Sequence, residues 1–414
     1  MKQKKLYILW DEAHIWGLIA WRAMVAMGIP YQLIKGKDIA HGALSGKSPC
    51  LLLVPGGSAR LKAHSLGALG REAISRYVAE GGHYFGICGG AGLGLSDSDG
   101  LGLCPWNRAA YTDRLQHLVS GHVLAACAPH PLAPETGQDL PLPVWWPGRF
   151  DPQPNSSVTV LATYGGPAED LWVADLPLSS LPDNVFGEWQ ALYGINMQPD
   201  FLRGQPCVVH GLHGAGTYTL SYSHLETPHS LAANTWLAHL LHTLAGFEPQ
   251  TTSTPPWPVE QQSPVWPHND DTRPLWEARK GVHDLLALGL THNLLFRRTE
   301  WLWGWRTGIP GAALNNLYAA LCTALALPPT PAAMAYWYQQ REGFCRALDT
   351  FIPGTEGYLL AERLATTLNA SLPDAVDRHG LKEQRSALFG PPMSGGGVYK
   401  ELLTVADELI FLLG

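Results

Sequence analysis

The stretch that decides the fold is Gly81-Gly82-His83-Tyr84-Phe85-Gly86-Ile87-Cys88-Gly89-Gly90-Ala91-Gly92-Leu93-Gly94-Leu95. A short apolar strand leads to one cysteine, and a run of small residues then opens a helix. This order predicts a nucleophile elbow, a sharp strand-to-helix turn whose flanking positions have no room for side chains. Gly86, Gly89 and Gly90 supply that room. The alternative interpretation of this stretch alone is a buried structural cysteine in a glycine-rich turn.

Length and composition exclude several classes of protein. The 414 residues suffice for two or three domains, and the net charge of -7 argues against a nucleic-acid partner. The seven cysteines form no C-x-x-C pair, which indicates reduced thiols and a cytoplasmic location, without a metal site or a cofactor. Since no apolar run approaches about 18 residues, we expect no membrane span.

The N-terminal part alternates between short apolar strands and helices. This pattern predicts an α/β fold with a doubly wound, mostly parallel sheet. In such sheets the active crevice lies beyond the carboxyl ends of the strands, which is where Gly57 and Cys88 fall. The expected strands are 6–10, 31–34, 50–54 and 84–87, and the expected helices are 14–27 and 71–79.

After the elbow the sequence becomes rich in residues that favour strands. A helix over 230–244 then returns the chain to the sheet. The expected strands are 121–128, 142–146, 158–164, 207–211 and 216–222.

Prolines crowd residues 247–271, which we interpret as a linker between a domain over 1–246 and a second domain over 272–414. All elements beyond the linker are predicted to be helical, so the second domain is expected to be an all-α bundle. Trp301-Leu302-Trp303-Gly304-Trp305 could dock a ligand or partner, but aromatic residues at this spacing more commonly belong to a core. The expected helices are 274–288, 293–305, 312–325, 331–348, 357–368 and 398–413.

A cysteine nucleophile needs a base, a group that orients the base, and donors for the oxyanion. His224 and Glu226 alternate on an extended segment just after a strand and could supply the first two. Gly57 follows a strand end and Gly89 follows the cysteine, so their amides could form the oxyanion hole. Because the chain holds 17 histidines, a surface or structural role for His224 is the alternative.

The order of these blocks resembles the class I glutamine amidotransferase-like superfamily over residues 1 to about 245, and most of all the family named for the N-terminal domain of biotin-protein ligases. This resemblance implies a flavodoxin-like sheet and a triad of Cys88, His224 and Glu226. The blocks that carry it are Val54-Pro55-Gly56-Gly57, the stretch from Tyr77 to Ala91, Val144-Trp145-Trp146-Pro147-Gly148-Arg149-Phe150, and the stretch from Gly216 to Glu226.

The sequence departs from these families at several points. Gly92 stands where glutamine-hydrolysing members commonly carry Gln, and Leu225 stands where they commonly carry Pro. No segment resembles the Gly-Arg-Gly-Arg-x-Gly adenylate loop, so we do not expect a biotin ligase. Neither a synthetase domain nor a Walker loop is recognisable, and residues 272–414 resemble no family.

The sequence thus predicts a cysteine-dependent hydrolase or amidotransferase-like enzyme that cleaves a C–N amide bond in a small molecule or peptide. Arg149, after a Pro-Gly turn, could bind a substrate carboxylate, or could be an ordinary surface arginine. Two other readings stay open: a non-catalytic ligand-binding or regulatory module with the same fold, and a peptidase-like hydrolase. The helical domain could bind a protein partner.

Overall fold

The computed structural model describes residues 4–45, 49–110, 119–135, 139–154, 157–391 and 395–414. The chain forms two compact units, unit 1 over Met1–Pro256 and unit 2 over Trp257–Gly414. The division between them lies inside the proline-rich range 247–271. Within the described ranges, no helix has both the length and the apolar character needed to cross a membrane.

Five parallel strands form one half of the unit 1 sheet. They lie side by side in the order β2 (Tyr31–Ile34), β1 (Leu6–Leu9), β3 (Leu51–Val54), β4 (His83–Ile87) and β13 (Gly216–Ser221). When only these five strands are counted, β13 is the fifth along the chain and the order is 2-1-3-4-5, which is that of doubly wound, flavodoxin-like sheets. The predicted α/β class is confirmed.

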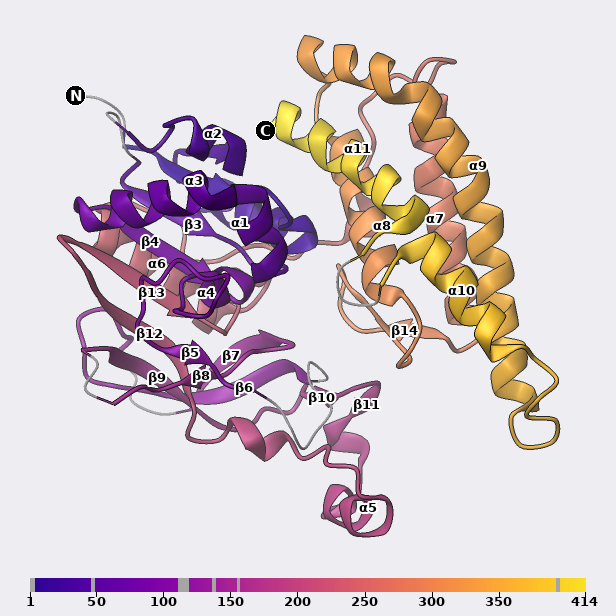
Figure 1. The fold of residues 1–414 in the computed structure, drawn as a ribbon, viewed down its shortest axis with the longest axis horizontal. Helices are drawn as coiled ribbons and strands as arrows, with labels where there is room; N and C mark the ends of the chain where they lie inside the picture. Colours follow the sequence, from indigo (N-terminus) through magenta and orange to yellow (C-terminus); the bar gives the residue numbers. More distant parts are fainter. Residues whose placement is uncertain (1–3, 46–48, 111–118, 136–138, 155–156, 392–394) are drawn as a thin grey trace. The chain divides into compact units, whose positions relative to one another are not determined.

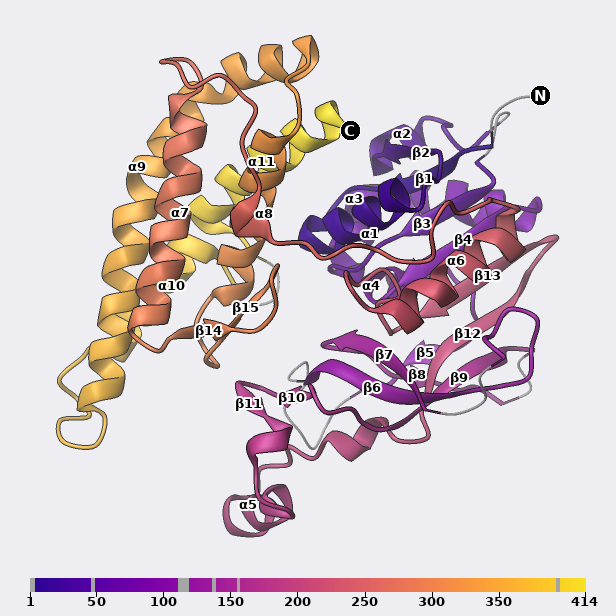
Figure 2. The ribbon, with the colours of Figure 1, turned by 180° about the vertical axis from the view of Figure 1, so that it is seen from behind.

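Helices cover both faces of these parallel strands. Adjacent residues of a strand point to opposite faces. Leu52 and Tyr84 belong to the core cluster formed with α3 (Ala59–Ala79), whereas their neighbours Leu53 and Phe85 are buried on the other face. Helix α3 lies over the sheet in Figure 1, and α6 (Leu231–Ala245) lies over it in the reverse view of Figure 2. The remaining helices of this half are α1 (His14–Ala26), α2 (Gly36–Ala40) and α4 (Gly89–Leu93).

The other half of the same sheet is antiparallel, so the 11-stranded sheet is mixed. Strand β12 (Pro206–His213) runs antiparallel to β13, and the turn between them contains Gly214 at a φ of +63°. A connection this short can join only antiparallel strands, which ends the parallel series. Continuing from β12, the order is β9 (Thr159–Pro167), β6 (Val119–Cys127), β10 (Trp172–Val173) and β11 (Leu176–Pro177). Strand β7 (Leu140–Trp145) lies off this path and pairs with β6, and β5 (Asn107–Arg108) pairs separately with β8 (Phe150–Asp151).

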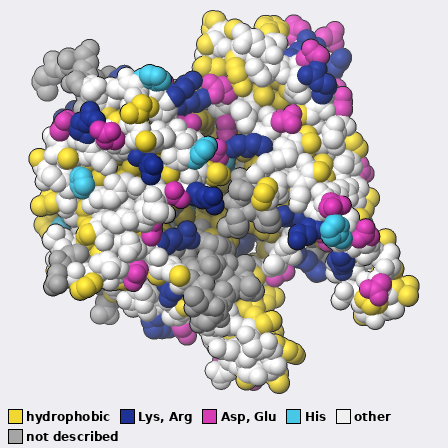
Figure 3. All heavy atoms as spheres, viewed as in Figure 1, with side chains coloured by type: hydrophobic (Ala, Val, Ile, Leu, Met, Phe, Trp, Pro, Cys, Tyr) yellow, Lys and Arg dark blue, Asp and Glu magenta, His cyan; other side chains and the backbone are white. Residues whose placement is uncertain are grey.

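The surface combines mixed charges with one exposed apolar helix. On the face drawn in Figure 3, Lys and Arg side chains are interspersed with those of Asp and Glu. Helix α5 (Val185–Tyr193) buries only Phe186, while Leu192 and Tyr193 at its end are exposed. Helix α5 was not predicted, because it follows an extension of short strands whose sequence has no clear period.

The proline-rich segment is bound on each side of the unit division. Within unit 1, the Thr254 amide donates to Asn234 Oδ1 at 2.9 Å. Within unit 2, Trp257 is buried and stacks on Trp301, with ring centroids 6.5 Å apart. Trp266 Nε1 donates to the Leu327 carbonyl at 2.9 Å. Most of the segment interpreted as a linker therefore packs against one unit or the other.

The described residues of unit 2 form mainly five long helices. The predicted helices 331–348 and 357–368 are one continuous helix, α9, which contains Pro353. Helix α10 (Arg378–Phe389) was not predicted. The helices are α7 (Arg273–Thr291), α8 (Gly311–Ala326), α9 (Pro331–Leu368), α10 (Arg378–Phe389) and α11 (Gly397–Leu413).

The predictions of a helix over 293–305 and of an all-α second domain are wrong. This segment forms an antiparallel hairpin of β14 (Leu295–Arg297) and β15 (Trp303–Trp305). Asn315 of α8 explains the outcome, because its side chain accepts from the Trp303 amide at 2.8 Å and donates to the Trp303 carbonyl at 2.9 Å. Trp301 and Trp303 are buried, so the tryptophan cluster is part of the core.

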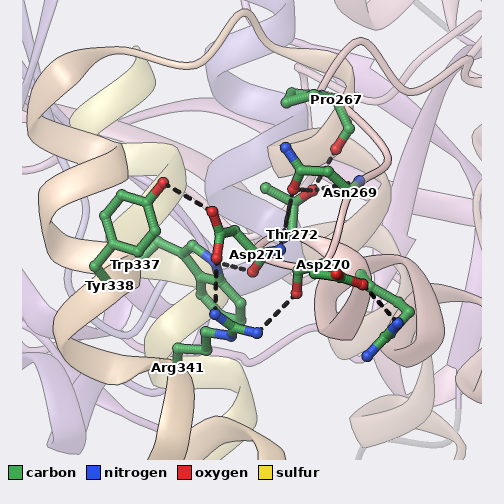
Figure 4. Close-up of polar contacts among 9 residues, drawn as sticks. Pro267, Asn269, Asp270, Asp271, Thr272, Trp337, Tyr338 and Arg341 are labelled. Carbon is green, nitrogen blue, oxygen red and sulfur yellow. Dashed lines mark hydrogen bonds and ion pairs between the residues drawn. The ribbon is translucent and has the colours of Figure 1, made fainter.

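A network of polar side chains fixes the start of α7 (Figure 4). Thr272 stands at the N-cap position, but its hydroxyl accepts no bond from an amide of the helix and donates to the Pro267 carbonyl. Asp271 binds two residues of α9: its carboxylate accepts from Arg341 at 2.9 Å and its carbonyl accepts from Trp337 Nε1 at 2.9 Å. These bonds fasten α7 to α9.

Candidate active site

Cys88 occupies a backbone conformation that non-glycine residues rarely adopt. Its φ is 49° and its ψ is -104°, at the junction of β4 and α4. The Cys88 amide donates to the Ser221 carbonyl at 2.7 Å, which holds the turn against β13. A Cβ atom on Gly89 would overlap the Gly57 carbonyl oxygen, and one on Gly90 would overlap the Val54 carbonyl oxygen. The glycines are needed because backbone from the neighbouring strand end fills these positions.

His224 and Glu226 form a fully buried pair. His224 Nδ1 and Glu226 Oε1 are 2.8 Å apart, and both side chains have no exposed surface. Burial lowers the pKa of His224, but the charges of Glu226 and Cys88 outweigh it and raise the pKa to about 10. Within the described residues, no hydrogen bond of normal geometry reaches His224 Nε2, although the Cys88 side chain lies close enough for its charge and hydrogen bonding to raise the pKa of His224. The carboxylate therefore holds one ring nitrogen and leaves the other available for a reacting group.

The Pro-Gly-Gly loop after β3 lies against both the elbow and His224. Gly57 has a φ of +107° and packs against Gly89, as described above. A Cβ atom on Gly56 would lie 3.0 Å from His224 Cε1 and 3.0 Å from Trp16. The Trp16 ring also packs on the His224 ring, with centroids 4.7 Å apart. Three strand ends and helix α1 thus enclose the candidate base.

Residues behind the segment 224–227 hold it in place. Thr227 Oγ1 donates to the His224 carbonyl at 2.8 Å and accepts from Trp145 Nε1 at 3.2 Å. Asn234 Nδ2 donates to the carbonyls of Leu225 and Thr227 at 2.8 and 2.9 Å. Because these partners are buried, the loop that carries the pair is rigidly positioned.

The two amides predicted for the oxyanion hole lie in adjoining backbone. Neither the Gly57 nor the Gly89 amide donates a hydrogen bond to the part of the chain that the structure describes. Gly89 is the first residue of α4, where amides lack helical acceptors. The role of these amides in an oxyanion hole stays a prediction.

Arg149 makes contacts that fix its guanidinium elsewhere. Its NH2 donates to the Ala110 carbonyl at 2.9 Å, and its guanidinium carbon lies 5.7 Å from the centre of the Phe201 ring. No contact of Arg149 with Cys88 is found among the described residues. The predicted role in binding a substrate carboxylate stays a prediction.

Several residues of the site were not predicted from the sequence. Trp16, Gly56 and Asn234 touch the candidate base or its loop, but nothing in their local sequence indicates this. Gly92 faces Tyr222: a Cβ atom there would lie 3.9 Å from the Tyr222 hydroxyl. Among the residues that the structure describes, no group of three or more His, Cys, Asp or Glu side chains is arranged to bind a metal ion.

Comparison with known proteins gives limited similarity. No protein-family model matches this chain. An uncharacterized protein of Chlamydia muridarum is 34% identical over an alignment of 116 residues, and the match covers 23% of this chain and 45% of that protein. This chain therefore matches less than half of the length of that relative.

Solved structures resemble this chain only weakly. A protein described as a GMP synthase subunit from Thermoplasma acidophilum has a TM-score of 0.38 at 12% identity, covering 59% of this chain and 96% of that one. A glutamine amidotransferase from Thermotoga maritima has a TM-score of 0.33 at 10% identity, with coverages of 58% and 83%. A β-galactosidase from Bacillus circulans has a TM-score of 0.39 at 12% identity, with coverages of 60% and 32%. Because these scores are low, the fold assignment rests on the strand order.

Proposed function

We propose that unit 1 is a cysteine-dependent enzyme that cleaves a C–N amide bond, with Cys88 as nucleophile, His224 as proton carrier and Glu226 as the group that orients His224. The observation that supports this most is the buried His224–Glu226 pair. It leaves His224 Nε2 without a hydrogen bond of normal geometry among the described residues, and the Cys88 charge raises the pKa of the imidazole. A purely structural histidine would be expected to have both ring nitrogens bonded.

The proposed reaction has two stages. The Cys88 thiolate attacks the amide carbon, and the amides of Gly57 and Gly89 donate to the oxyanion that forms. His224, protonated beside the thiolate, gives its proton to the leaving nitrogen as the C–N bond breaks, and a thioester remains. Water then attacks the thioester carbon while His224 takes its proton, and the acid leaves as the Cys88 sulfur is released.

A small primary amide is the proposed substrate class, and glutamine is the first compound to test. The resemblance to glutamine amidotransferase-like proteins supports this, whereas Gly92 replaces the Gln that glutamine-hydrolysing members commonly carry. Position 92 has space, since an added Cβ atom would meet only Ala59 Cβ at 3.4 Å and the Tyr222 hydroxyl. We therefore expect Gly92→Gln to fold and to lower the KM for glutamine, measured by ammonia release.

The proposal is tested by the alkylation of Cys88 with iodoacetamide, followed by peptide mass spectrometry. At about pH 6.5 an ordinary thiol is largely protonated and reacts slowly, whereas a thiolate paired with an imidazolium reacts rapidly. We expect Cys88 to be labelled at least about 10-fold faster than Cys50, a second partly exposed cysteine in the same chain. His224→Ala should remove that difference.

Equal labelling of the two cysteines, unchanged by His224→Ala, would contradict the enzyme proposal. It would favour the non-catalytic module that keeps the fold and uses the crevice to bind a ligand. If the thiol is activated, Cys88→Ala should abolish nearly all amide hydrolysis, because members of such a triad act as a unit.

A further inference from the structure

A second chain of hydrogen bonds in unit 1 joins a serine, a histidine and an aspartate. His122 Nε2 lies 3.0 Å from Ser230 Oγ, and His122 Nδ1 lies 2.9 Å from Asp170 Oδ2. The His122 amide also donates to Asp170 Oδ1 at 3.0 Å. The order is therefore hydroxyl, imidazole and carboxylate, with each ring nitrogen bonded to a different partner. This is the arrangement in which an imidazole can take the proton of a serine.

Three separate elements bring these side chains together. His122 lies in the middle of β6, Asp170 lies in the turn between β9 and β10, and Ser230 is the N-cap residue of α6. The turn is held to β6 by a bond from the Ala168 amide to the His122 carbonyl at 3.1 Å. Since 108 residues separate His122 from Ser230, no local pattern in the sequence indicates the cluster.

The start of α6 leaves the Ser230 hydroxyl and nearby amides for another use. A serine at the N-cap normally accepts a bond from an amide of the first turn, but Ser230 makes no such cap. The first helical bond is donated by Asn234 to the Ser230 carbonyl, so the amides of residues 231–233 have no helical acceptor. The amide directly after a nucleophilic serine is a common oxyanion donor, and here it belongs to Leu231.

We propose that Ser230, His122 and Asp170 form a second, serine-based acyl-transfer site, which hydrolyses esters of short apolar acids. Ser230 Oγ bonds to the acyl carbon as His122 Nε2 takes the hydroxyl proton. The ester C–O bond then breaks, and His122 returns that proton to the leaving alkoxide. Water then attacks the acyl carbon while His122 takes its proton. His122 returns the proton to Ser230 Oγ as the acid leaves, which restores the serine.

Exposure determines the class of substrate. Ser230 is nearly buried, at 5% exposure, whereas the side chains of His122 and Asp170 are 25% and 47% exposed. Water screens the Asp170 charge, so it stabilises an imidazolium less than the buried Glu226 does. A less strongly stabilised imidazolium is sufficient to cleave an ester, because the alkoxide of an ester leaves more readily than the amine of an amide. Leu231, the next residue along the chain, is 65% exposed, and we propose that it offers an apolar surface to a short acyl chain.

This site is distinct from the one around Cys88, although both adjoin the same loop. The Ser230 amide donates to the Thr227 carbonyl at 3.3 Å, and Thr227 in turn holds the His224 carbonyl. The three side chains could instead serve only to anchor α6 and that loop. Modification of the serine itself distinguishes the two roles, because an anchoring hydroxyl has no reason to react with an acylating or phosphonylating reagent.

The test uses the full chain carrying Cys88→Ala, so that the thiol cannot react. We expect a fluorophosphonate probe to label Ser230, located by peptide mass spectrometry, and p-nitrophenyl acetate to be hydrolysed. His122→Gln should slow both reactions at least about 100-fold, and Asp170→Asn at least about 10-fold. The control is His239→Gln. It changes a histidine whose ring bonds a backbone carbonyl, that of Pro131, and it should change neither rate.

The absence of label at Ser230 in the folded Cys88→Ala chain would overturn the proposal, and so would labelling that His122→Gln leaves unchanged. The first of these outcomes is measured on a chain in which Ser230, His122 and Asp170 are intact. The second requires unchanged labelling, so a folding defect in the His122 variant cannot produce either outcome. The iodoacetamide test of Cys88 is independent, so the two proposals can fail separately.

Discussion

Replacing His224 by leucine should destabilise unit 1 far more than replacing a typical buried histidine. Leucine keeps apolar bulk against the Trp16 ring, but it removes the partner of the Glu226 carboxylate. Glu226 is fully buried, and its Oε2 has no hydrogen bond among the described residues. Loss of one member of such a buried ion pair costs about 3–5 kcal/mol of unfolding free energy. We expect a loss of this size for His224→Leu.

The double variant His224→Leu with Glu226→Leu separates the charge effect from the loss of shape. With no buried carboxylate left, most of the lost stability should return, because apolar replacement of a whole buried pair is often neutral or stabilising. His64→Leu, at an exposed position, is the control and should change the unfolding free energy by less than about 0.5 kcal/mol.

The pH dependence of the unfolding free energy of unit 1 gives an independent check that His224 stabilises the fold in its protonated form. The folded protein binds the His224 proton more tightly than the unfolded chain, because the charges of Glu226 and Cys88 raise the pKa of His224 to about 10. This contribution is complete below about pH 6.5, the value of an ordinary histidine, and is lost as the pH rises through about 10. The double variant should lack that loss.

The assay is urea unfolding of the full chain, followed by circular dichroism between about pH 6 and pH 10. With two units, two transitions are expected, and only that of unit 1 should respond. A double variant as unstable as His224→Leu would refute the reasoning, since the cost would then come from packing and not from an unpaired charge.

Two further predictions concern positions where close contacts fix the backbone. Gly89→Ala should abolish amide hydrolysis and destabilise unit 1 by about 1–3 kcal/mol, because its Cβ atom would overlap the Gly57 carbonyl. Gly187→Ala in α5, where an added Cβ atom would meet only Gln198 Nε2 at 3.6 Å, should be tolerated, and urea unfolding with an activity assay compares the two. Asn315→Ala should lower the unfolding free energy of unit 2 by about 3 kcal/mol, because two buried backbone groups of Trp303 lose their partner; a change below about 1 kcal/mol would contradict this role.

The parallel half of the sheet was predictable because its signals are local. Each strand is a short apolar run ended by a turn, and Cys88 lies among glycines that only an elbow requires. The longer strands of the antiparallel half were predicted, whereas the two-residue strands β10 and β11 were not, and the pairing depends on which distant strand each one meets. The segment 293–305 was misassigned because its tryptophans fit either a helix or a strand. The choice is made by Asn315, a residue of another element.

The candidate site was predictable only where its residues stand in short motifs. Cys88, His224 and Glu226 lie beside strand ends, so their meeting follows from the topology. Trp16 could not be predicted, because its contact with His224 joins two elements far apart in the chain. The Ser230 cluster escaped for the same reason: it depends on the pairing of antiparallel strands, which spacing does not specify.

The backbone at Cys88 has a consequence for how this chain can evolve. A non-glycine residue held at a φ of 49° and a ψ of -104° costs on the order of 1–3 kcal/mol, and glycine would remove that cost. Cys88→Gly should therefore fold more stably than Cys88→Ala. In a lineage that no longer needs the thiol, mutation would tend to replace this cysteine with glycine. The residue at position 88 of a related sequence should therefore indicate whether selection still maintains the thiol: cysteine where it does, and glycine where it does not.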